Sequence, residues 1–254
     1  MHGYDDTTYG DAFADVYDEW YGNITDVVAT VDALAGIAMQ STVDGAALDV
    51  VELGVGTGRI AIPLAARLQP ATVWGIDSSR RMLDRLDANG AAHRVRTVLG
   101  DMVDALPPGP LGLVFVAFNT FFALGSASAQ QRCFDSVASR LASGGSFVIE
   151  AFVPDDSTPS GDIVEVRSMR ADEVVLSISR YGADQTAEGH LVQFSEAGGV
   201  RLRPWSIRYA SVAELDAMAT HAGFGLAQRW ESFAGDVFTD DSQRHVSVYS
   251  RTGL

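Results

Sequence analysis

Residues 50–59, VVELGVGTGR, carry the strongest structural signal of the sequence. An apolar run leads into glycines at positions 54, 56 and 58, and the helical pattern GRIAIPLAARL follows at residues 58–68. Gly54 and Gly56 allow the backbone to bend sharply and to approach a ligand, because no Cβ stands in the way. We expect Gly58 to allow close packing of the helix that follows. A tight turn with a purely structural use is the alternative that this spacing leaves open.

Apolar segments alternate with helical patterns downstream of this loop. Strands are expected at residues 71–77 (ATVWGID), 94–101 (RVRTVLGD), 111–122 (LGLVFVAFNTFF) and 146–153 (SFVIEAFV). Helical patterns stand between them, and the glycines of SGG at 143–145 are expected to end the last helix before the strand at 146–153. This alternation predicts an α/β fold with a Rossmann-like, doubly wound parallel sheet that carries helices on both faces. Upstream of the loop, residues 11–38 predict two helices broken near Gly22.

The pattern changes near residue 159. Four strand-like segments alternate apolar and polar residues with no helix between them, so we expect an antiparallel β insertion. An insertion at this point of such a sheet is well placed to cover the ligand crevice, and with it the active site, at the carboxyl ends of the strands. The chain therefore divides into an N-terminal helical region (1–40), a Rossmann-like core (41–158), the insertion (159–210) and a segment that completes the core sheet (211–254).

Carboxylates stand at the ends of three successive predicted strands. Glu52 precedes the glycines and can balance an ammonium group, whereas Asp77 stands where ribose hydroxyls are held in sheets of this kind. Asp101 can accept a hydrogen bond from an adenine amine, with Met102 packed on the ring. Each acid alone can be an ordinary turn or cap residue. Together, beside the glycines, they predict a nucleoside site.

The order of these motifs resembles that of class I S-adenosylmethionine-dependent methyltransferases along nearly the whole chain. The quoted motifs are ELGVGTGR, GID, GDM, a strand ending in FN, and LASGGSFVIE. The resemblance implies S-adenosylmethionine as cofactor and a strand order of 3-2-1-4-5-7-6 with the last strand antiparallel. The resemblance also implies that residues 41–158 form the cofactor-binding core. The positions that it implies for cofactor binding are Tyr21, Glu52, Gly54, Gly56, Gly58, Arg59, Asp77, Ser78, Met82, Gly100, Asp101, Met102 and Asn119.

The N-terminal stretch YGDAFADVYDEWYG, residues 9–22, is similar to the lid of small-molecule N-methyltransferases from antibiotic pathways. That group includes enzymes that act on amino sugars and on the N-terminal amine of a small peptide. Within it, the chain length and the tyrosines at positions 9 and 17 favour the enzymes that N-methylate the proline ring of lincosamide antibiotics. The resemblance implies N-methylation of a small natural-product amine, late in antibiotic biosynthesis.

Aromatic residues recur every four positions in this stretch, at Tyr9, Phe13, Tyr17 and Tyr21, and so share one face of a helix. We interpret the N-terminal helical region as a lid whose phenols orient the cofactor or the substrate nitrogen. An aromatic core stripe is the alternative. The predicted catalytic residues are Tyr9, Tyr17 and Phe118, the last at the tip of the fourth core strand near the transferable methyl group.

The charge and composition of the chain restrict which kinds of molecule it can bind. The chain has 18 Lys and Arg residues against 33 Asp and Glu residues, a net charge of −15. This charge disfavours nucleic acid and anionic membranes and attracts a small amine, although it can also serve only solubility. The single cysteine, Cys133, and the absence of a metal-ligand motif predict no metal site. Without a signal sequence or a long apolar run, we expect a cytoplasmic protein.

Two other functions remain open. An O-methyltransferase would need a base, for which His190 and His245 are the candidates. The chain could also be a sensor that retains this fold and binds S-adenosylmethionine but catalyses no reaction. The tyrosines and the negative charge favour nitrogen over oxygen as the acceptor. Apolar alternation on both faces of the insertion also predicts a homo-oligomer formed through it.

Overall fold

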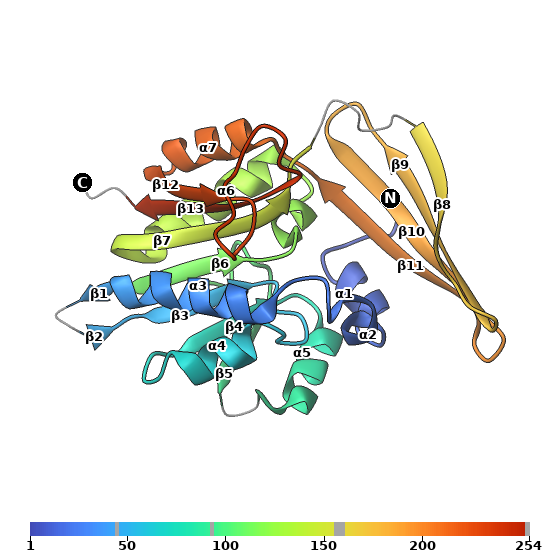
Figure 1. The fold of residues 1–254 in the computed structure, drawn as a ribbon, viewed down its shortest axis with the longest axis horizontal. Helices are drawn as coiled ribbons and strands as arrows, with labels where there is room; N and C mark the ends of the chain where they lie inside the picture. The colour runs from blue at the N-terminus through green and yellow to red at the C-terminus, as the bar shows by residue number, and fades with distance from the viewer. Residues whose placement is uncertain (44–45, 92–93, 155–160, 252–254) are drawn as a thin grey trace.

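A seven-stranded sheet with helices on both faces lies beside a separate four-stranded antiparallel sheet (Figure 1). This is a computed structural model, and it describes residues 1–43, 46–91, 94–154 and 161–251. A small hairpin of β1 (Thr42–Val43) and β2 (Ala46–Ala47) precedes the large sheet. No helix in the described ranges is long and apolar enough to cross a membrane.

The large sheet has the strand order β12-β13-β7-β6-β3-β4-β5. The strands β5, β4, β3, β6 and β7 pair in parallel, and β13 is antiparallel to both of its neighbours. Numbered along the chain, this order is 3-2-1-4-5-7-6, which confirms the prediction. The strands are β3 (Asp49–Leu53), β4 (Val73–Asp77), β5 (Val95–Leu99), β6 (Leu111–Val116), β7 (Leu141–Phe152), β12 (Phe224–Trp230) and β13 (Arg244–Arg251).

Helices cover both faces because the central strands are apolar on both sides; every residue of β6 is buried. Apolar residues of α3 (Val27–Gln40), α4 (Ala61–Arg67) and α5 (Arg80–Leu86) belong to one buried cluster. Those of α6 (Ala127–Arg140) and α7 (Val212–His221) belong to another.

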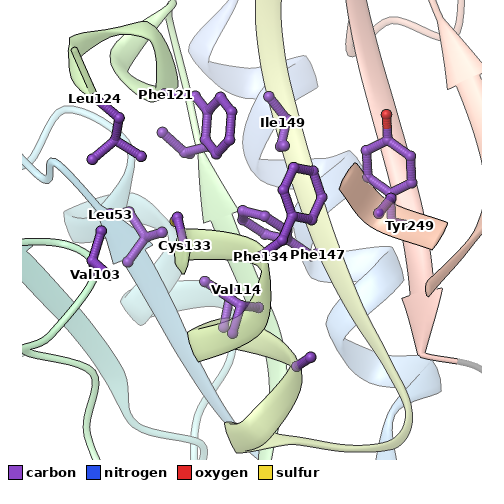
Figure 2. Packing of buried hydrophobic residues seen from close by; sticks show 14 of the residues in the cluster. Leu53, Val103, Val114, Phe121, Leu124, Cys133, Phe134, Phe147, Ile149 and Tyr249 are labelled. Carbon is purple, nitrogen blue, oxygen red and sulfur yellow. The ribbon is translucent and has the colours of Figure 1, made fainter. Parts of the chain in front are cut away.

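Aromatic rings fill the second of these clusters, as Figure 2 shows. The ring centroid of Phe134 on α6 lies 5.1 Å from that of Phe147 and 5.7 Å from that of Tyr249. Cys133 is fully buried beside them, and burial raises the pKa of its thiol. Cys133 is therefore a small core residue.

The N-terminal region contains one more helix than predicted. We expected two helices broken near Gly22, but α1 (Thr8–Phe13) and α2 (Tyr17–Tyr21) are separate and precede α3. The prediction that Tyr9 and Tyr17 share one continuous helix is therefore wrong. The break has a physical cause, because the guanidinium of Arg85 donates hydrogen bonds to the carbonyls of Ala14 and Asp15, which would accept from the next turn in a continuous helix.

Two strand boundaries also differ from the prediction. The fourth core strand was expected to reach residue 122, but β6 ends at Val116, and a tight turn and a 3₁₀ turn (Thr120–Ala123) follow. The glycines at 144 and 145 were expected to separate α6 from a strand. Instead β7 begins at Leu141 and runs through them, with a shift in its pairing to β6.

The second sheet is the predicted antiparallel insertion. Its order is β11-β10-β9-β8, and all neighbours are antiparallel. Ser195 pairs with Gly199 across the expected hairpin turn. The expected domain boundary at 158–159 lies outside the described residues. The strands are β8 (Gly161–Met169), β9 (Glu173–Tyr181), β10 (Thr186–Ser195) and β11 (Gly199–Arg208).

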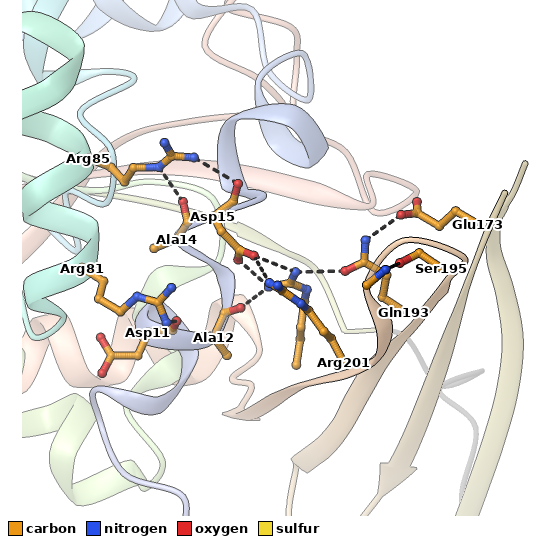
Figure 3. A network of polar contacts seen from close by, with 12 residues as sticks. Asp11, Ala12, Ala14, Asp15, Arg81, Arg85, Glu173, Gln193, Ser195 and Arg201 are labelled. Carbon is orange, nitrogen blue, oxygen red and sulfur yellow. Dashed lines mark hydrogen bonds and ion pairs between the residues drawn. The ribbon is translucent and has the colours of Figure 1, made fainter.

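Arginines hold the N-terminal region between the two sheets (Figure 3). From α5, Arg85 donates to the carbonyls of Ala14 and Asp15, each at 3.0 Å. From β11, Arg203 and Arg201 each donate to the carboxylate of Asp15 at 2.6 Å. Arg203 is only 2% exposed, and its guanidinium lowers the pKa of Asp15. Loss of Asp15 would therefore destabilise the fold, because it would leave the buried charge of Arg203 without its partner.

Candidate active site

A first cavity lies between the glycine loop that follows β3, the ends of β4 and β5, and the N-terminal region. Tyr9 and Tyr17 line it from the N-terminal side. The positions from the predicted cofactor site that line it are Gly54, Gly56, Asp77, Ser78, Met82, Gly100, Asp101 and Met102. The structure therefore gathers residues from three strand ends into one cavity.

The glycine loop approaches its neighbours too closely for side chains. Gly54 and Gly56 have φ values of 68° and 55°, in the left-handed region that favours glycine. A Cβ on Gly54 would lie 2.3 Å from Cγ2 of Thr120. The N–H of Gly56 donates to Oδ2 of Asp77 at 2.8 Å, and the N–H of Ser79 donates to Oδ1 at 2.9 Å. Asp77 thus ties the loop to the start of α5.

The other predicted residues of this cavity also connect its walls. The hydroxyl of Ser78 donates to the carbonyl of Asp6 at 2.6 Å, which joins α5 to the N-terminal region. The carboxylate of Asp101 accepts from the N–H of Val103 at 2.7 Å. The N–H of Gly100 donates to the carbonyl of Asp77 at 3.0 Å. These bonds hold Asp77 and Asp101 on neighbouring strand ends.

Three of the predicted cofactor-binding residues, Glu52, Gly58 and Arg59, line neither the first cavity nor the second one described below. Glu52 is buried beneath the loop, and one of its carboxylate oxygens has no partner among the described residues. Burial raises the pKa of Glu52 to about 8, although the nearby charge of Arg59 opposes this shift. Arg59 donates to the hydroxyl of Thr25. A Cβ on Gly58 would lie 2.9 Å from Leu86, so this glycine permits close helix packing.

A second cavity of about 380 Å³ adjoins the first. It lies between the N-terminal helices, the tip of β6 and one face of the four-stranded sheet, and its volume is typical of small-molecule sites. Tyr9 and Tyr17 line both cavities. Tyr21, Phe118 and Asn119, which were predicted at or near the site, line only the second.

Sequence reasoning missed several residues of the second cavity. They come from one face of the four-stranded sheet, where alternate positions point the same way. The alternation of apolar and polar residues is visible in the sequence, but it does not show which face of the sheet is covered by the rest of the protein. These residues are Glu165, Arg167, Ser177, Ser179, Tyr181, Leu191, Trp205 and Ile207. Tyr4, also missed, lines both cavities.

The phenols shared by the two cavities are un-ionised. Burial raises the pKa of both Tyr9 and Tyr17 above the usual value for tyrosine. Their hydroxyl groups can therefore donate and accept hydrogen bonds at the junction, but they carry no negative charge. The ring of Tyr9 stacks on that of Phe13 at 4.3 Å, which fixes its orientation.

Neither candidate histidine lines either cavity. His245 is fully buried on β13, where Nδ1 lies 2.8 Å from the hydroxyl of Ser247, and burial lowers its pKa to about 4. His190 on β10 neighbours Leu191, which lines the second cavity, and adjacent strand residues point to opposite faces. Neither His190 nor His245 is therefore placed to act as a base at the site.

Comparisons with known proteins agree with this arrangement. A family model described as a methyltransferase domain matches residues 50–145. The solved structure of the CcbJ methyltransferase from Streptomyces caelestis is 38% identical, covers 98% of this chain and 100% of its own, and superposes with a TM-score of 0.88. The chain belongs to the S-adenosylmethionine-dependent methyltransferases.

Two further relatives are more distant. CalS10, an amino pentose methyltransferase from Micromonospora echinaspora solved with S-adenosylmethionine bound, is 21% identical. The match covers 93% of this chain and 97% of CalS10 with a TM-score of 0.70, so it shows the fold. The release factor glutamine methyltransferase of Gloeobacter violaceus is 34% identical over 87 residues. That match spans 33% of this methyltransferase and 30% of the relative.

The cofactor of this methyltransferase is S-adenosylmethionine, and the residues that line the first cavity have the chemistry to hold it. Gly54 and Gly56 place no side chain between the loop and the cavity, and the acids Asp77 and Asp101 line it. The unpartnered oxygen of Glu52 beneath the loop suits a cationic group. When bound, the cofactor supplies an electrophilic methyl group on a sulfonium.

Replacing Asp77 tests this assignment. Asp77→Ala removes the acceptor of the Gly56 and Ser79 N–H groups and a carboxylate that lines the cavity. We expect the binding free energy of S-adenosylmethionine to weaken by about 1.5–3 kcal/mol, as for lost charge-assisted hydrogen bonds. Calorimetry measures it, with Asp84→Ala on the exposed side of α5 as control. Unchanged affinity in the folded variant would remove Asp77 from the cofactor site.

The protonation of Glu52 provides a second test. With a pKa of about 8, its carboxyl is mostly protonated in the free protein near neutral pH. A cationic group bound nearby favours the ionised form, so S-adenosylmethionine should release up to about one proton on binding. Calorimetry in buffers of different ionisation enthalpy measures this release. Glu52→Gln should abolish it, and equal proton release in the variant and the wild type would contradict the role of Glu52.

Proposed function

We propose that this methyltransferase transfers the methyl group to an amine nitrogen of a small natural product, as a late step of antibiotic biosynthesis. One observation carries the proposal: the two cavities meet at the un-ionised phenols of Tyr9 and Tyr17, and among the described residues no histidine lines either cavity. In its narrowest form the acceptor is the ring nitrogen of a proline-derived lincosamide precursor. The N-terminal tyrosine spacing and the chain length support that form.

An amine suits this junction better than an alcohol. An amine that is protonated in solution loses one proton to water and is then a nucleophile, whereas an alcohol needs a base at the site. Tyr9 and Tyr17 orient the nitrogen by hydrogen bonds, and holding the reactants in line contributes about 7–11 kcal/mol in well-oriented systems. The aromatic face of Phe118 stabilises the cationic amine product.

Three parts of the chain then have separate tasks in this proposal. The N-terminal helices act as the lid, the Rossmann-like core holds the cofactor, and the four-stranded sheet covers the acceptor. The fold similarity to CalS10, an amino pentose methyltransferase, supports an amine-bearing acceptor. The negative charge of −15 favours approach of a cationic molecule.

A panel of acceptors tests the function. The protein is incubated with methyl-labelled S-adenosylmethionine and L-prolinamide, glucosamine, a simple phenol or a short peptide, and the labelled product is identified by mass spectrometry. We expect label on nitrogen, with L-prolinamide preferred. Label only on the phenol would favour O-methylation, and cofactor binding without turnover of any acceptor would favour a sensor.

Removing the phenol oxygens tests the junction itself. Tyr9→Phe and Tyr17→Phe should each lower kcat by about 10- to 1000-fold, because a positioned hydrogen-bonding group is lost while the ring remains. Stability should change little. Tyr249→Phe is the matched control, since its phenol donates to Asp216 outside both cavities. Full kcat in both site variants would return Tyr9 and Tyr17 to a purely structural role.

We also propose that the outer face of the four-stranded sheet binds a second copy of the chain. Val166, Met169, Val200 and Leu202 are between 59% and 72% exposed there. The paired rows Val166–Leu176–Val192–Leu202 and Met169–Val174–Phe194–Val200 make the face continuous across all four strands. A broad apolar face of this kind is typical of an association surface, and a two-fold axis would pair it with itself.

A charge placed on this face tests the association. Leu202→Glu should convert the wild-type oligomer to a monomer, because two such faces would bury unpaired carboxylates. Analytical ultracentrifugation measures the mass, and Arg132→Glu on the exposed side of α6 is the control. A wild-type protein that remains monomeric at high concentration would refute the proposal. Affinity for the cofactor should be unaffected, because Leu202 is outside the first cavity.

A further inference from the structure

The turn after β6 has an unusual backbone. Phe118 and Asn119 are successive non-glycine residues with φ values of 51° and 63°. L-residues rarely adopt this left-handed region, and they stay there only when their surroundings hold them. The ring of Phe118 lines the second cavity, with its centroid 5.8 Å from that of Tyr21. The interaction that holds this turn therefore sets one wall of the second cavity, which is the acceptor cavity of the proposed function.

Glu150 on β7 bonds both residues of the turn. Its Oε2 accepts from the N–H of Phe118 at 2.9 Å, and its carbonyl accepts from the N–H of Asn119 at 3.1 Å. The pairing of β6 with β7 ends one residue earlier, at Ile149, so Glu150 occupies the place where the strands part. A third hydrogen bond joins the turn to β7, because Oδ1 of Asn119 accepts from the N–H of Phe152 at 2.7 Å.

Glu150 lies behind the turn and not in the acceptor cavity. It lines neither the first nor the second cavity, but a third hollow that shares Phe118 and Asn119 with the second and is also lined by Arg244. Burial raises the pKa of its carboxyl, while the N–H of Phe118 and the charges of Arg59 and Arg244 oppose this rise. Its contact with the site therefore passes through the backbone of Phe118.

We propose that Glu150 is a positioning residue for methyl transfer, whose carboxylate holds the Phe118–Asn119 turn in its left-handed form and so sets the Phe118 ring against the acceptor. This inference rests on the proposed function of the second cavity. A purely structural role would lower stability without a separate effect on kcat. A role as base is not supported, because the carboxylate is bonded to the turn and lies outside the acceptor cavity.

Two variants of similar length separate these roles. Glu150→Gln keeps an oxygen that accepts from the N–H of Phe118, whereas Glu150→Met removes it. With L-prolinamide as acceptor, we expect Glu150→Met to lower kcat roughly tenfold or more, with the KM for S-adenosylmethionine within about twofold of the wild type. Glu150→Gln should recover most of the kcat. Loss of thermal stability in Glu150→Met with kcat unchanged would overturn the proposal.

A double-variant cycle shows whether the effect passes through Phe118. In the Phe118→Ala background, Glu150→Met should cause no further fall in kcat, because the ring that it positions is already absent. Independent, multiplicative losses would overturn the proposal. Equal losses in Glu150→Gln and Glu150→Met would do the same, because the retained acceptor would then have no effect.

Crystal structures of the two variants keep this test separate from that of the proposed function. If the wild type methylates none of the amines, the proposed function fails, but the turn is still observable. We expect positive φ at Phe118 in Glu150→Gln and a changed turn in Glu150→Met. An unchanged turn in Glu150→Met would overturn the positioning role whatever the activity.

Discussion

The carboxylate of Asp77 accepts hydrogen bonds from the N–H groups of Gly56 and Ser79, and the rest of the site depends on these two bonds. They hold the glycine loop against the start of α5. The hydroxyl of Ser79 in turn donates to Asp11 at 2.6 Å, and Gly10 packs so closely that a Cβ would lie 2.4 Å from that of Ser79. The N-terminal region is therefore seated on the cofactor cavity by the residues that form it.

The N-terminal region also binds the four-stranded sheet. Its aromatic residues Tyr9 and Tyr17 face the cavities, while Asp15 binds Arg203 of β11. Because Arg203 is nearly fully buried, loss of Asp15 would leave a charge without its partner, which is strongly unfavourable. One short segment thus joins the cofactor cavity to the sheet that covers the acceptor, and the phenols lie at the junction of the two cavities.

The sequence predicted those features that depend on local pattern and chain order. The glycines after β3 and the acids at the ends of β4 and β5 were expected close together, and they line one cavity; the motif order implied the sheet topology, which the structure has. The break after α1 could not be predicted, because Arg85 acts on Ala14 from 71 residues away along the chain. The turn at Phe118 was hidden in an apolar run, since periodicity carries no information on the sign of φ. Glu165 and Arg167 show an alternating pattern, but only the packed sheet reveals that their face lines the cavity.

A crystal structure with S-adenosylhomocysteine and L-prolinamide would test most directly that donor and acceptor occupy adjoining cavities joined at the two tyrosines. The account predicts the nucleoside in contact with Asp77 and Asp101 in the first cavity. It predicts the amine in the second cavity, with its nitrogen within hydrogen-bond distance of the phenol of Tyr9 or Tyr17. An amine bound away from both phenols, or a nucleoside outside the first cavity, would contradict the account.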